Sequence, residues 1–370
     1  MPLIGGALAV VVVTSVLYLR SATPSLNTAA VTPPPATIQH LHGTYTTAFD
    51  FVDASHGWAL VLDYTEPGSR FWIFATSDGA SRWRLQFGAT APSDGPFGPA
   101  TSIYVQFFDL QHGFAFAGDL YRTVDGGAHW QLVNAPMGGP LFTFATARHG
   151  WMLPVDWSVP PQLYTTEDGG LTWSAISTPL PQGLNAQPFA GFGFRDDGEG
   201  WAGTALNAPI VYRTLDGGES WVAVKVPTDE PADLYYTSVR LLPGAAVLAI
   251  VSTPNGFIGG YYSDDRGDTW RALHPLPEPE WLYNATFLDA THWWVARYGF
   301  LYKTSTAGQD WSRVLVRPLP GGWNIGPAHA IDVDHGWWSM TSTTDSLDSA
   351  LMMTSDGGAD WRTVSMPQPA

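Results

Sequence analysis

The chain contains no cysteine and few charged residues. None of its 370 residues is Cys, and Asp, Glu, Lys and Arg together make up 14%. The absence of Cys excludes disulfides, thiolate metal sites, a Cys nucleophile and a lipidated N-terminal Cys. It is compatible with export but does not determine the redox compartment.

Positive charge is especially scarce. There are 17 Lys and Arg against 33 Asp and Glu, which gives a formal net charge of −16. A surface of this sign repels polyphosphate chains and anionic lipid. We therefore expect no nucleic acid among the partners of this protein.

Tryptophan, glycine and proline are abundant instead. The sequence has 18 Trp, 39 Gly and 30 Pro, and 45% of its residues are hydrophobic. Gly and Pro interrupt helices, whereas Trp suits packed sheets, so this composition indicates many short strands joined by tight turns. At this length the chain forms either two domains or one repetitive domain, and we expect an all-β repeat protein.

The N-terminus carries an uncharged apolar run at residues 3–19, LIGGALAVVVVTSVLYL. As a helix it would reach about 25 Å, which is marginally long enough to span a bilayer. Cleavage after the nearest small residue, Ala22, would place Arg20 at position −3 of the cleavage site, which a signal peptidase does not favour. We expect residues 1–20 to form an uncleaved signal anchor, with a cleaved signal peptide or a buried element of the fold as alternatives.

Residues 21–39 are rich in Pro, Thr and Ala and carry no charge after the anchor. Such a segment is typical of an extended linker. We expect the linker to connect the membrane to one folded domain over residues 40–370. The domain would then be extracytoplasmic, at the cell surface or in the periplasm or lumen, and secreted if the segment is cleaved.

Seven near-copies of one short motif divide the folded part. Typical copies are TVDGGAHW at 123–130 and TSDGGADW at 354–361. Their terminal tryptophans are 41 to 50 residues apart, and each period holds about four apolar segments, which is the scale of a propeller blade. We predict a seven-bladed β-propeller of four-stranded antiparallel blades. The terminal residues are Trp83, Trp130, Trp173, Trp221, Trp270, Trp311 and Trp361.

The motif has the chemistry of a turn. Its Asp can accept hydrogen bonds from backbone N–H groups, and its Gly permits positive φ. Thr306 replaces the Asp in the sixth copy and Ala80 replaces the second Gly in the first. A motif that tolerates such changes is expected to be structural. The carboxylates are Asp78, Asp125, Asp168, Asp216, Asp265 and Asp356.

A second repeated element, with the pattern HGW or HGF, stands between the first two strands of most blades and is missing from the fifth. Its histidines His56, His112, His149 and His335 belong to different blades and cannot converge on one ion. We expect them to stabilise turns, and we expect neither a metal site nor a cofactor.

Together these two motifs resemble known repeats. Ser/Thr-x-Asp-x-Gly-x-x-Trp resembles the Asp-box (BNR) repeats of sialidases and sortilin-type propellers. Its pairing with the HGW element, over about residues 45 to 366, looks most like the photosystem II assembly and stability factor family. That resemblance implies a seven-bladed, non-enzymatic, chaperone-like propeller of the lumen or periplasm.

The same family is associated with an arginine-rich surface patch. The matching positions, three before each box Asp, hold only three cations, Arg122, Arg213 and Lys303. They are either the remainder of such a patch or solvated charges that project from the sheet.

One face of the disc is expected to carry function. Because adjacent strands run in opposite directions, the box turns and the HGW turns share one face, and the variable loops lie on the other. Rigid aromatic and charged loops could bind a peptide or a glycan, or they could be incidental surface. The candidate residues are Asp63, Arg70, Asp156, Trp157, Tyr235, Tyr236, Trp281, Arg297 and Trp323.

Three functions remain open at this stage: a protein-binding scaffold, a glycan-binding module and a sialidase-like glycoside hydrolase. The Phe/Tyr-Arg-Ile-Pro motif of sialidases is absent, and only Arg70, Arg297 and Arg317 fall on the candidate face. Several acidic residues keep a two-carboxylate hydrolase arithmetically possible. We expect a non-enzymatic scaffold that binds an exported or membrane protein.

Overall fold

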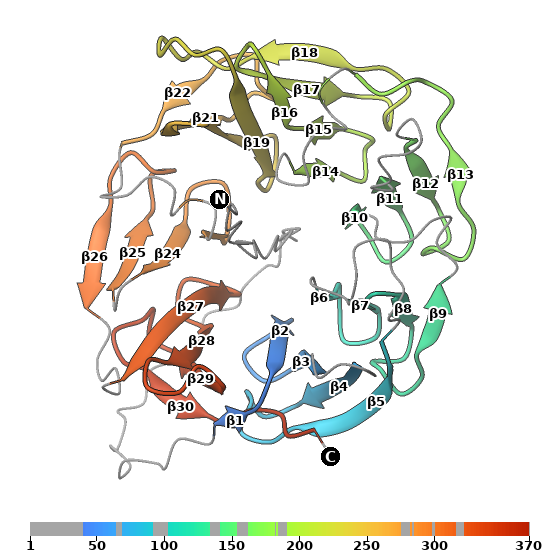
Figure 1. Ribbon diagram of the computed structural model, residues 1–370, viewed down its shortest axis with the longest axis vertical. Coiled ribbons are helices and arrows are strands. Elements are labelled where there is room, and N and C mark those ends of the chain that lie inside the picture. Colours follow the sequence, from blue (N-terminus) through green and yellow to red (C-terminus); the bar gives the residue numbers. More distant parts are fainter. Residues whose placement is uncertain are drawn as a thin grey trace, which may run out of the picture.

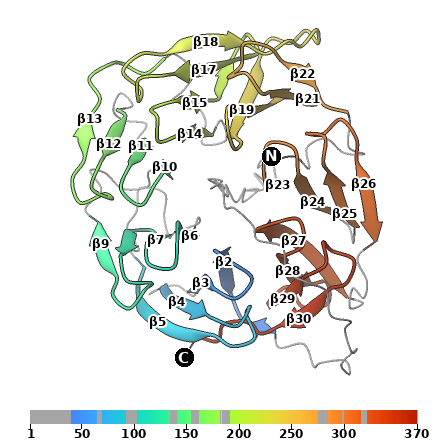
Figure 2. The ribbon, with the colours of Figure 1, turned by 180° about the vertical axis from the view of Figure 1, so that it is seen from behind.

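Seven antiparallel sheets are arranged around a ring in this protein (Figures 1 and 2). Their order confirms the predicted all-β, seven-bladed propeller. The predicted anchor and linker, residues 1–39, lie outside the described residues, and within the described part no helix is long and apolar enough to cross a membrane. The computed structural model describes residues 40–63, 69–91, 103–133, 141–153, 162–181, 183, 191–274, 282, 285–297, 300–315 and 322–369.

The first four blades follow one another along the chain. In each, the first strand lies near the ring axis and the last at the rim (Figure 1). Their strands are β2 (Tyr45–Phe51), β3 (Gly57–Asp63), β4 (Arg70–Thr76) and β5 (Arg84–Thr90) in blade 1; β6 (Ile103–Phe107), β7 (Gly113–Ala117), β8 (Leu120–Thr123) and β9 (Gln131–Val133) in blade 2; β10 (Leu141–Phe144), β11 (Gly150–Leu153), β12 (Tyr164–Thr166) and β13 (Ser174–Ala175) in blade 3; and β14 (Phe192–Phe194), β15 (Gly200–Ala202), β17 (Ile210–Thr214) and β18 (Val222–Lys225) in blade 4.

The last three blades include the two that depart from four strands. They consist of β19 (Tyr235–Leu241), β20 (Val247–Thr253), β21 (Gly256–Ser263) and β22 (Arg271–Ala272) in blade 5; β23 (Thr286–Phe287), β24 (Trp293–Arg297), β25 (Phe300–Thr304) and β26 (Ser312–Leu315) in blade 6; and β27 (Trp323–Ala330), β28 (Gly336–Ser342), β29 (Asp348–Thr354) and β30 (Arg362–Val364) in blade 7.

Blades 5 and 7 each gain a fifth strand from elsewhere in the chain. β16 (Thr204–Leu206) leaves blade 4 and pairs with β19 of blade 5. β1 (Leu41–His42) pairs with β29 of blade 7 before the chain enters blade 1. The prediction of four strands therefore holds for five blades, and the segment around residue 41 does supply an extra edge strand.

The hydrophobic core lies between the blades. Buried side chains fall into seven clusters, and each cluster joins two neighbouring blades. The stacked rings of Trp58 in blade 1 and Phe107 in blade 2 have centroids 3.5 Å apart. Trp151 and Phe194 form the equivalent stack between blades 3 and 4, at 4.2 Å. The aromatic residue of the HGW element thus binds one blade to the next.

The glycine of the HGW element makes room for this stack. Gly57 lies directly opposite Phe51 in the sheet, and a Cβ at Gly57 would overlap the Phe51 ring. Gly150 has the same relationship to Phe144. A larger residue at either position would push the Phe ring away from its partner blade, which explains why the HGW element has Gly before its aromatic residue.

Ring closure uses both ends of the folded domain. Phe51 of blade 1 stacks on Trp337 of blade 7, with centroids 3.6 Å apart. After β30, Ser365 donates its N–H to the oxygen of Ala80 and accepts a hydrogen bond from Trp83 Nε1 of 2.8 Å. Leu41 of β1 is buried in the same interface. The ring is therefore closed by contacts from the N-terminal and C-terminal strands together.

Candidate binding face

One face of the disc is occupied by turns that bond to each other. In every blade the residue after the box position donates its N–H to a carbonyl of the turn between the first two strands. Gly79 bonds to Ser55 in this way, and Arg266 does so in blade 5, where the HGW element is missing. Both motifs therefore lie on the same face, as the sequence predicts, and they are held together. The donor and acceptor pairs are Gly79 and Ser55, Gly126 and Gln111, Gly169 and Arg148, Gly217 and Gly198, Arg266 and Ala245, Ala307 and Thr291, and Gly357 and Asp334.

The box carboxylate is fully engaged inside its own turn. Asp168 Oδ1 accepts hydrogen bonds from the Thr172 N–H and the Thr166 hydroxyl, both of 2.9 Å, and Oδ2 accepts one from the Thr172 hydroxyl. The bonds from Thr172 lower the pKa of Asp168 to about 2. A carboxylate in this state is an anchor for backbone N–H groups and has no proton to give at neutral pH.

Blade 6 keeps the turn without a carboxylate. The Thr306 hydroxyl accepts the N–H of Asp310 at 2.9 Å and so replaces one contact of the missing Asp. Ala307 adopts φ of 51° and Ala80 of blade 1 adopts 68°, at positions where most other boxes have Gly. The turn therefore keeps its shape without the carboxylate and without these two Gly residues.

The histidines of the second element stabilise the turn that contains them. His56 Nδ1 lies 2.9 Å from Asp53 Oδ2, and the other oxygen of Asp53 accepts the N–H groups of Ser55 and His56. His112, His292 and His335 repeat this arrangement with Asp109, Asp289 and Asp332. His149 differs, since its Nδ1 lies 3.2 Å from Asp196 of the next blade.

The three cations on the third strands cap the box of the following blade. Arg122 Nη1 donates to the carbonyl oxygens of Asp168 and Gly169 at 2.6 and 3.2 Å. Lys303 Nζ donates to the oxygen of Gly357 at 2.8 Å, and burial lowers its pKa. Arg213 binds the oxygen of Arg266 in the same way. These side chains form neither a shared patch nor free solvated charges, because each joins two blades.

A charged cluster between blades 4 and 5 was not predicted from the sequence. The side chain of Glu199 is buried, and its Oε1 accepts the indole N–H of Trp201 at 2.7 Å. Arg266 Nε lies 3.1 Å from Glu199 Oε2, an ion pair without hydrogen-bond geometry. Arg195 completes the cluster and donates to the oxygens of Leu242, Gly244 and Ala246.

The cluster explains how blade 5 forms its turn without the HGW element. Arg195 reaches across from blade 4 and satisfies three carbonyl oxygens of the LLPGAAVLA turn. The presence of Glu in place of His in DGEGWA is the only sequence signal of this arrangement.

Of the residues predicted for the opposite face, Asp156, Trp157 and Trp281 lie outside the described part of the chain, so their place stays a prediction. Asp63 and Arg70 are cross-strand neighbours at the ends of β3 and β4. Arg70 is exposed and its guanidinium lies 5.5 Å from the ring centroid of Trp72.

The aromatic residues expected on this face are less exposed than the sequence suggested. Tyr235 is buried, so its prediction as an exposed aromatic is wrong: its hydroxyl donates to the oxygen of Glu230 and accepts the N–H of Ala232. Tyr236 is half-buried next to it, and Trp323 packs partly against the core between blades 6 and 7. Arg297 ends β24.

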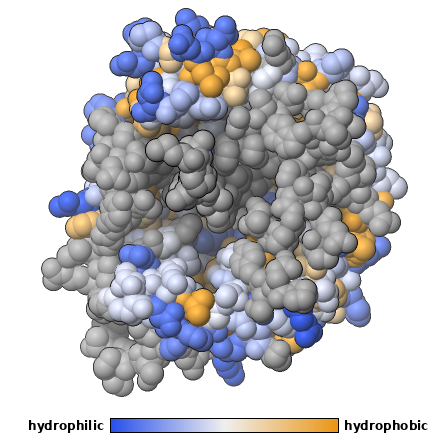
Figure 3. Space-filling model, in the orientation of Figure 1, coloured by the Kyte–Doolittle hydropathy of each residue, from blue (hydrophilic) through white to orange (hydrophobic). Residues whose placement is uncertain are grey.

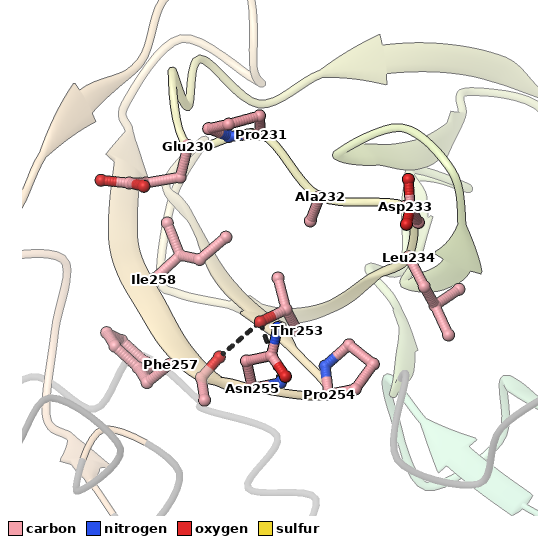
Figure 4. Close-up of a pocket in the computed structure, with 11 residues that line it drawn as sticks. Glu230, Pro231, Ala232, Asp233, Leu234, Thr253, Pro254, Asn255, Phe257 and Ile258 are labelled. Carbon is pink, nitrogen blue, oxygen red and sulfur yellow. Dashed lines mark hydrogen bonds between the residues drawn. The ribbon is translucent and has the colours of Figure 1, made fainter.

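A pocket of about 710 Å³ opens on this face at blade 5 (Figure 4). Its walls are the loop of residues 230–234, which leads from blade 4 into β19, and residues 253–258 of the hairpin between β20 and β21. In Figure 4 the loop arches over one side and the hairpin closes the other. The hydrogen bond from the Tyr235 hydroxyl to the oxygen of Glu230 holds the loop that forms one wall of the pocket.

The rim of this pocket carries negative charge. Glu230 and Asp233 are exposed on its rim, and the remaining lining residues are apolar or neutral, among them Leu234, Phe257 and Ile258. Hydrophilic residues and small apolar areas alternate around the part of the surface that is coloured in Figure 3. The pocket could therefore accept a ligand that combines an apolar group with positive charge.

Comparison with known proteins identifies the repeat and the fold. A family model of the BNR/Asp-box repeat matches residues 261–272, which include the box of blade 5. No curated protein matches the chain. Among solved structures, one described as YCF48 bound to D1 peptide is 18% identical, with a TM-score of 0.55, over 91% of this chain and 99% of that one.

Two further solved structures are similar to parts of this chain. YCF48 from Cyanidioschyzon merolae is 15% identical, with a TM-score of 0.52, over 86% of this chain and 96% of that one. The GH74 enzyme of Niastella koreensis is 15% identical, with a TM-score of 0.41, over 86% of this chain and 53% of that one. YCF48 is a photosystem II assembly factor, so the fold resembles that of the family indicated by the two motifs. The chain is a seven-bladed β-propeller built from BNR/Asp-box repeats.

Proposed function

We propose that this protein is a non-enzymatic propeller that binds a segment of another exported or membrane protein and supports its assembly or stability. The observation that carries the proposal is the difference between the two faces of the disc. On the Asp-box face, carboxylates, histidines and cations bond within and between blades. On the opposite face, two connecting segments of blade 5, residues 230–234 and 253–258, line an open pocket.

The pocket favours a peptide ligand. Its volume of about 710 Å³ can hold a few side chains, and its apolar walls and acidic rim suit a segment that pairs an apolar residue with Lys or Arg. The likeness to YCF48 bound to D1 peptide supports a peptide in preference to a glycan, because that propeller is described with a bound peptide. A glycan platform would need exposed aromatics, and Tyr235 is buried.

We also propose that the protein has no hydrolase activity. A glycosidase needs a carboxylic acid whose pKa is raised and a second carboxylate beside it. Burial raises the pKa of Asp119 in the turn between β7 and β8. No second acid contacts it among the described interactions, and the box carboxylates have lowered pKa values.

Membrane attachment on the extracytoplasmic side remains part of the proposal. It rests on the 17-residue uncharged run at residues 3–19 and on the Pro-rich linker that follows. Anchoring would hold the loop face within reach of exported segments near the bilayer.

Partner capture from membranes tests this function. The full chain, tagged at its C-terminus, is crosslinked in membranes and its partners are identified by mass spectrometry. The Glu230→Ala/Asp233→Ala variant should lose most of the specific partner. The Glu167→Ala/Glu219→Ala variant removes the same charge from exposed positions of the Asp-box face and should retain it. Equal loss in both variants, or in neither, would contradict the loop face as the binding face.

A further inference from the structure

Two histidines and two aspartates meet where the ring closes. His42 of β1 lies directly opposite Asp348 of β29, and its Nδ1 is 2.7 Å from Asp348 Oδ1. The same Nδ1 is 3.8 Å from Asp345 Oδ2, and His40 Nε2 is 3.6 Å from Asp348 Oδ1. Three of these residues, His42, Asp345 and Asp348, have ligand atoms that all lie within 4.8 Å of one another. Within the described residues they are the one such group of three or more His and carboxylate side chains.

These distances match the geometry of a zinc site. Tetrahedral Zn²⁺ binds His nitrogen and carboxylate oxygen at about 2.0 to 2.1 Å, which places ligand atoms about 3.3 Å apart. The separations of His42 Nδ1 from Asp348 Oδ1 and from Asp345 Oδ2, 2.7 and 3.8 Å, lie on both sides of this value. Small shifts of these side chains would therefore bring His42, Asp345 and Asp348 into coordination.

The backbone already holds both halves of the cluster. Asp345 Oδ1 accepts the N–H of Leu347 at 2.9 Å, which leaves Oδ2 directed at His42. The Asp348 N–H donates to the oxygen of Asp345, and Gly43 donates its N–H to Leu347. This is the outer-shell support that orients metal ligands in proteins.

The residue types select among metals. Calcium and magnesium prefer sets of oxygen ligands, whereas a set that combines imidazole with carboxylates suits Zn²⁺. The other His and Asp pairs among the described residues do not offer the same site. In the HGW turns, one His meets one Asp, and that Asp uses an oxygen for two backbone N–H groups, as His112 and Asp109 show.

We propose that His42, Asp345 and Asp348 bind one Zn²⁺, with water as the fourth ligand, and that this ion clamps β1 to the last blade. β1 has only two residues, and it is the point where the N-terminal segment meets the ring. A metal bridge there joins the first and last strands of the propeller. It secures the closure against forces or fluctuations that reach the ring through the linker.

Zinc titration of the full chain tests the site. The protein is purified in detergent, treated with a chelator, dialysed and titrated with ZnCl₂ by calorimetry. We expect a stoichiometry of one, a Tm that rises with zinc concentration, and slower hydrogen exchange at Leu41 and Gly43. Calcium at the same concentration should produce none of these changes.

Matched variants separate the site from other histidines on an acidic surface. Asp345→Asn keeps the oxygen that accepts the Leu347 N–H but loses the ligand charge, and it should weaken zinc binding about tenfold or more. His42→Ala, at a side chain that is 58% exposed, should do the same without unfolding the protein. His112→Ala should bind zinc as the wild type does. Absence of zinc binding in the wild type, or unchanged affinity in Asp345→Asn, would overturn the proposal.

Discussion

Arg122 of blade 2 donates a hydrogen bond of 2.6 Å from its guanidinium to the main-chain oxygen of Asp168 in blade 3. The contact passes over the interface between the blades and caps the turn in which Asp168 holds its own N–H and hydroxyl donors. Lys303 repeats it between blades 6 and 7. Arg122 and Lys303 stand at positions that could form an arginine patch in a similar propeller. Here each of them instead joins two neighbouring blades.

Loss of the Arg122 contact should destabilise the ring. Arg122→Met keeps the apolar stem and removes the donors, which should cost about 1 to 2 kcal/mol of unfolding free energy. The measurement is the urea midpoint. Arg84→Met, at an exposed position of β5, is the control and should melt as the wild type does. If Arg122→Met kept wild-type stability but lost a binding partner, the residue would belong to a ligand site instead.

The architecture could be predicted from the sequence because the box motif recurs seven times at a nearly constant period. A turn such as TVDGGAHW needs Asp and Gly at fixed positions for local reasons, and its period gives the blade. The contacts between blades had no such signal. Arg122 and Glu199 look like ordinary surface charges in the sequence, and only the packing of the next blade shows what they bond to.

The binding face was predicted as a surface but not residue by residue. Loop composition indicates exposure on average, whereas the exposure of one side chain depends on how its loop folds back. Tyr235 is predicted to be exposed because it lies in a variable connecting loop, yet its hydroxyl turns inward to bind that same loop. The pocket is formed by residues 230–234 and 253–258, two segments about twenty residues apart. No local sequence pattern indicates that these two segments lie together.

Gly150 should not tolerate a side chain. A Cβ at this position would overlap the ring of Phe144, and Phe144 stacks on Phe114 of the neighbouring blade with centroids 3.9 Å apart. Gly150→Ala should cost about 1 to 3 kcal/mol through overpacking. A double-mutant cycle with Phe144→Leu, read by thermal melting, should show a coupling between the two sites. Gly259→Ala, where the nearest atom would be 3.3 Å away, should cost less.

The box carboxylates should make the propeller sensitive to acid. Hydrogen bonds from His129 lower the pKa of Asp125 to about 2, and those from Thr269 do the same for Asp265. Because the pKa is lower in the folded state, this stabilisation is complete above about pH 4 and is lost as the pH falls through about 2. Melting temperature should therefore drop between pH 4 and pH 2.

Replacement of one box carboxylate tests the cause of that acid sensitivity. Asp168→Asn should lower stability at pH 7 by about 1 to 2 kcal/mol and make its pH dependence shallower. Thr306→Asp restores the missing carboxylate in blade 6 and should make the pH dependence steeper. An unchanged pH profile in both variants would assign the acid sensitivity to other groups.

Closure of the ring should depend on the first strand. Leu41 is 2% exposed and packs with Met366 and Trp337 in the interface between blades 7 and 1. Leu41→Ala should cost about 2 to 5 kcal/mol, the range for a buried Leu. Leu85→Ala removes the same atoms from an exposed site of β5 and should cost less than about 0.5 kcal/mol. Equal urea midpoints for the two variants would show that β1 does not close the ring.

Catalysis should be absent from the purified full chain. Fluorogenic sialosides and β-glucan and xyloglucan oligosaccharides are the substrates to assay, with and without calcium. Asp119, whose pKa is raised by burial, has no second acid among its described contacts, and a lone acid cannot supply both roles of a glycosidase. Asp156, Arg297 and Asp63 remain the other candidates from the sequence.

The outcome separates the three functions. Turnover that disappears in Asp119→Asn, Asp63→Asn or Asp156→Asn would replace the scaffold with a hydrolase. Binding of an oligosaccharide without turnover would favour a glycan-binding module, and Trp157→Ala, Trp281→Ala or Trp323→Ala should then weaken it by about 2 kcal/mol if these side chains are hot spots. Neither turnover nor glycan binding, together with peptide binding that depends on Glu230 and Asp233, is the result that the acidic pocket of blade 5 predicts.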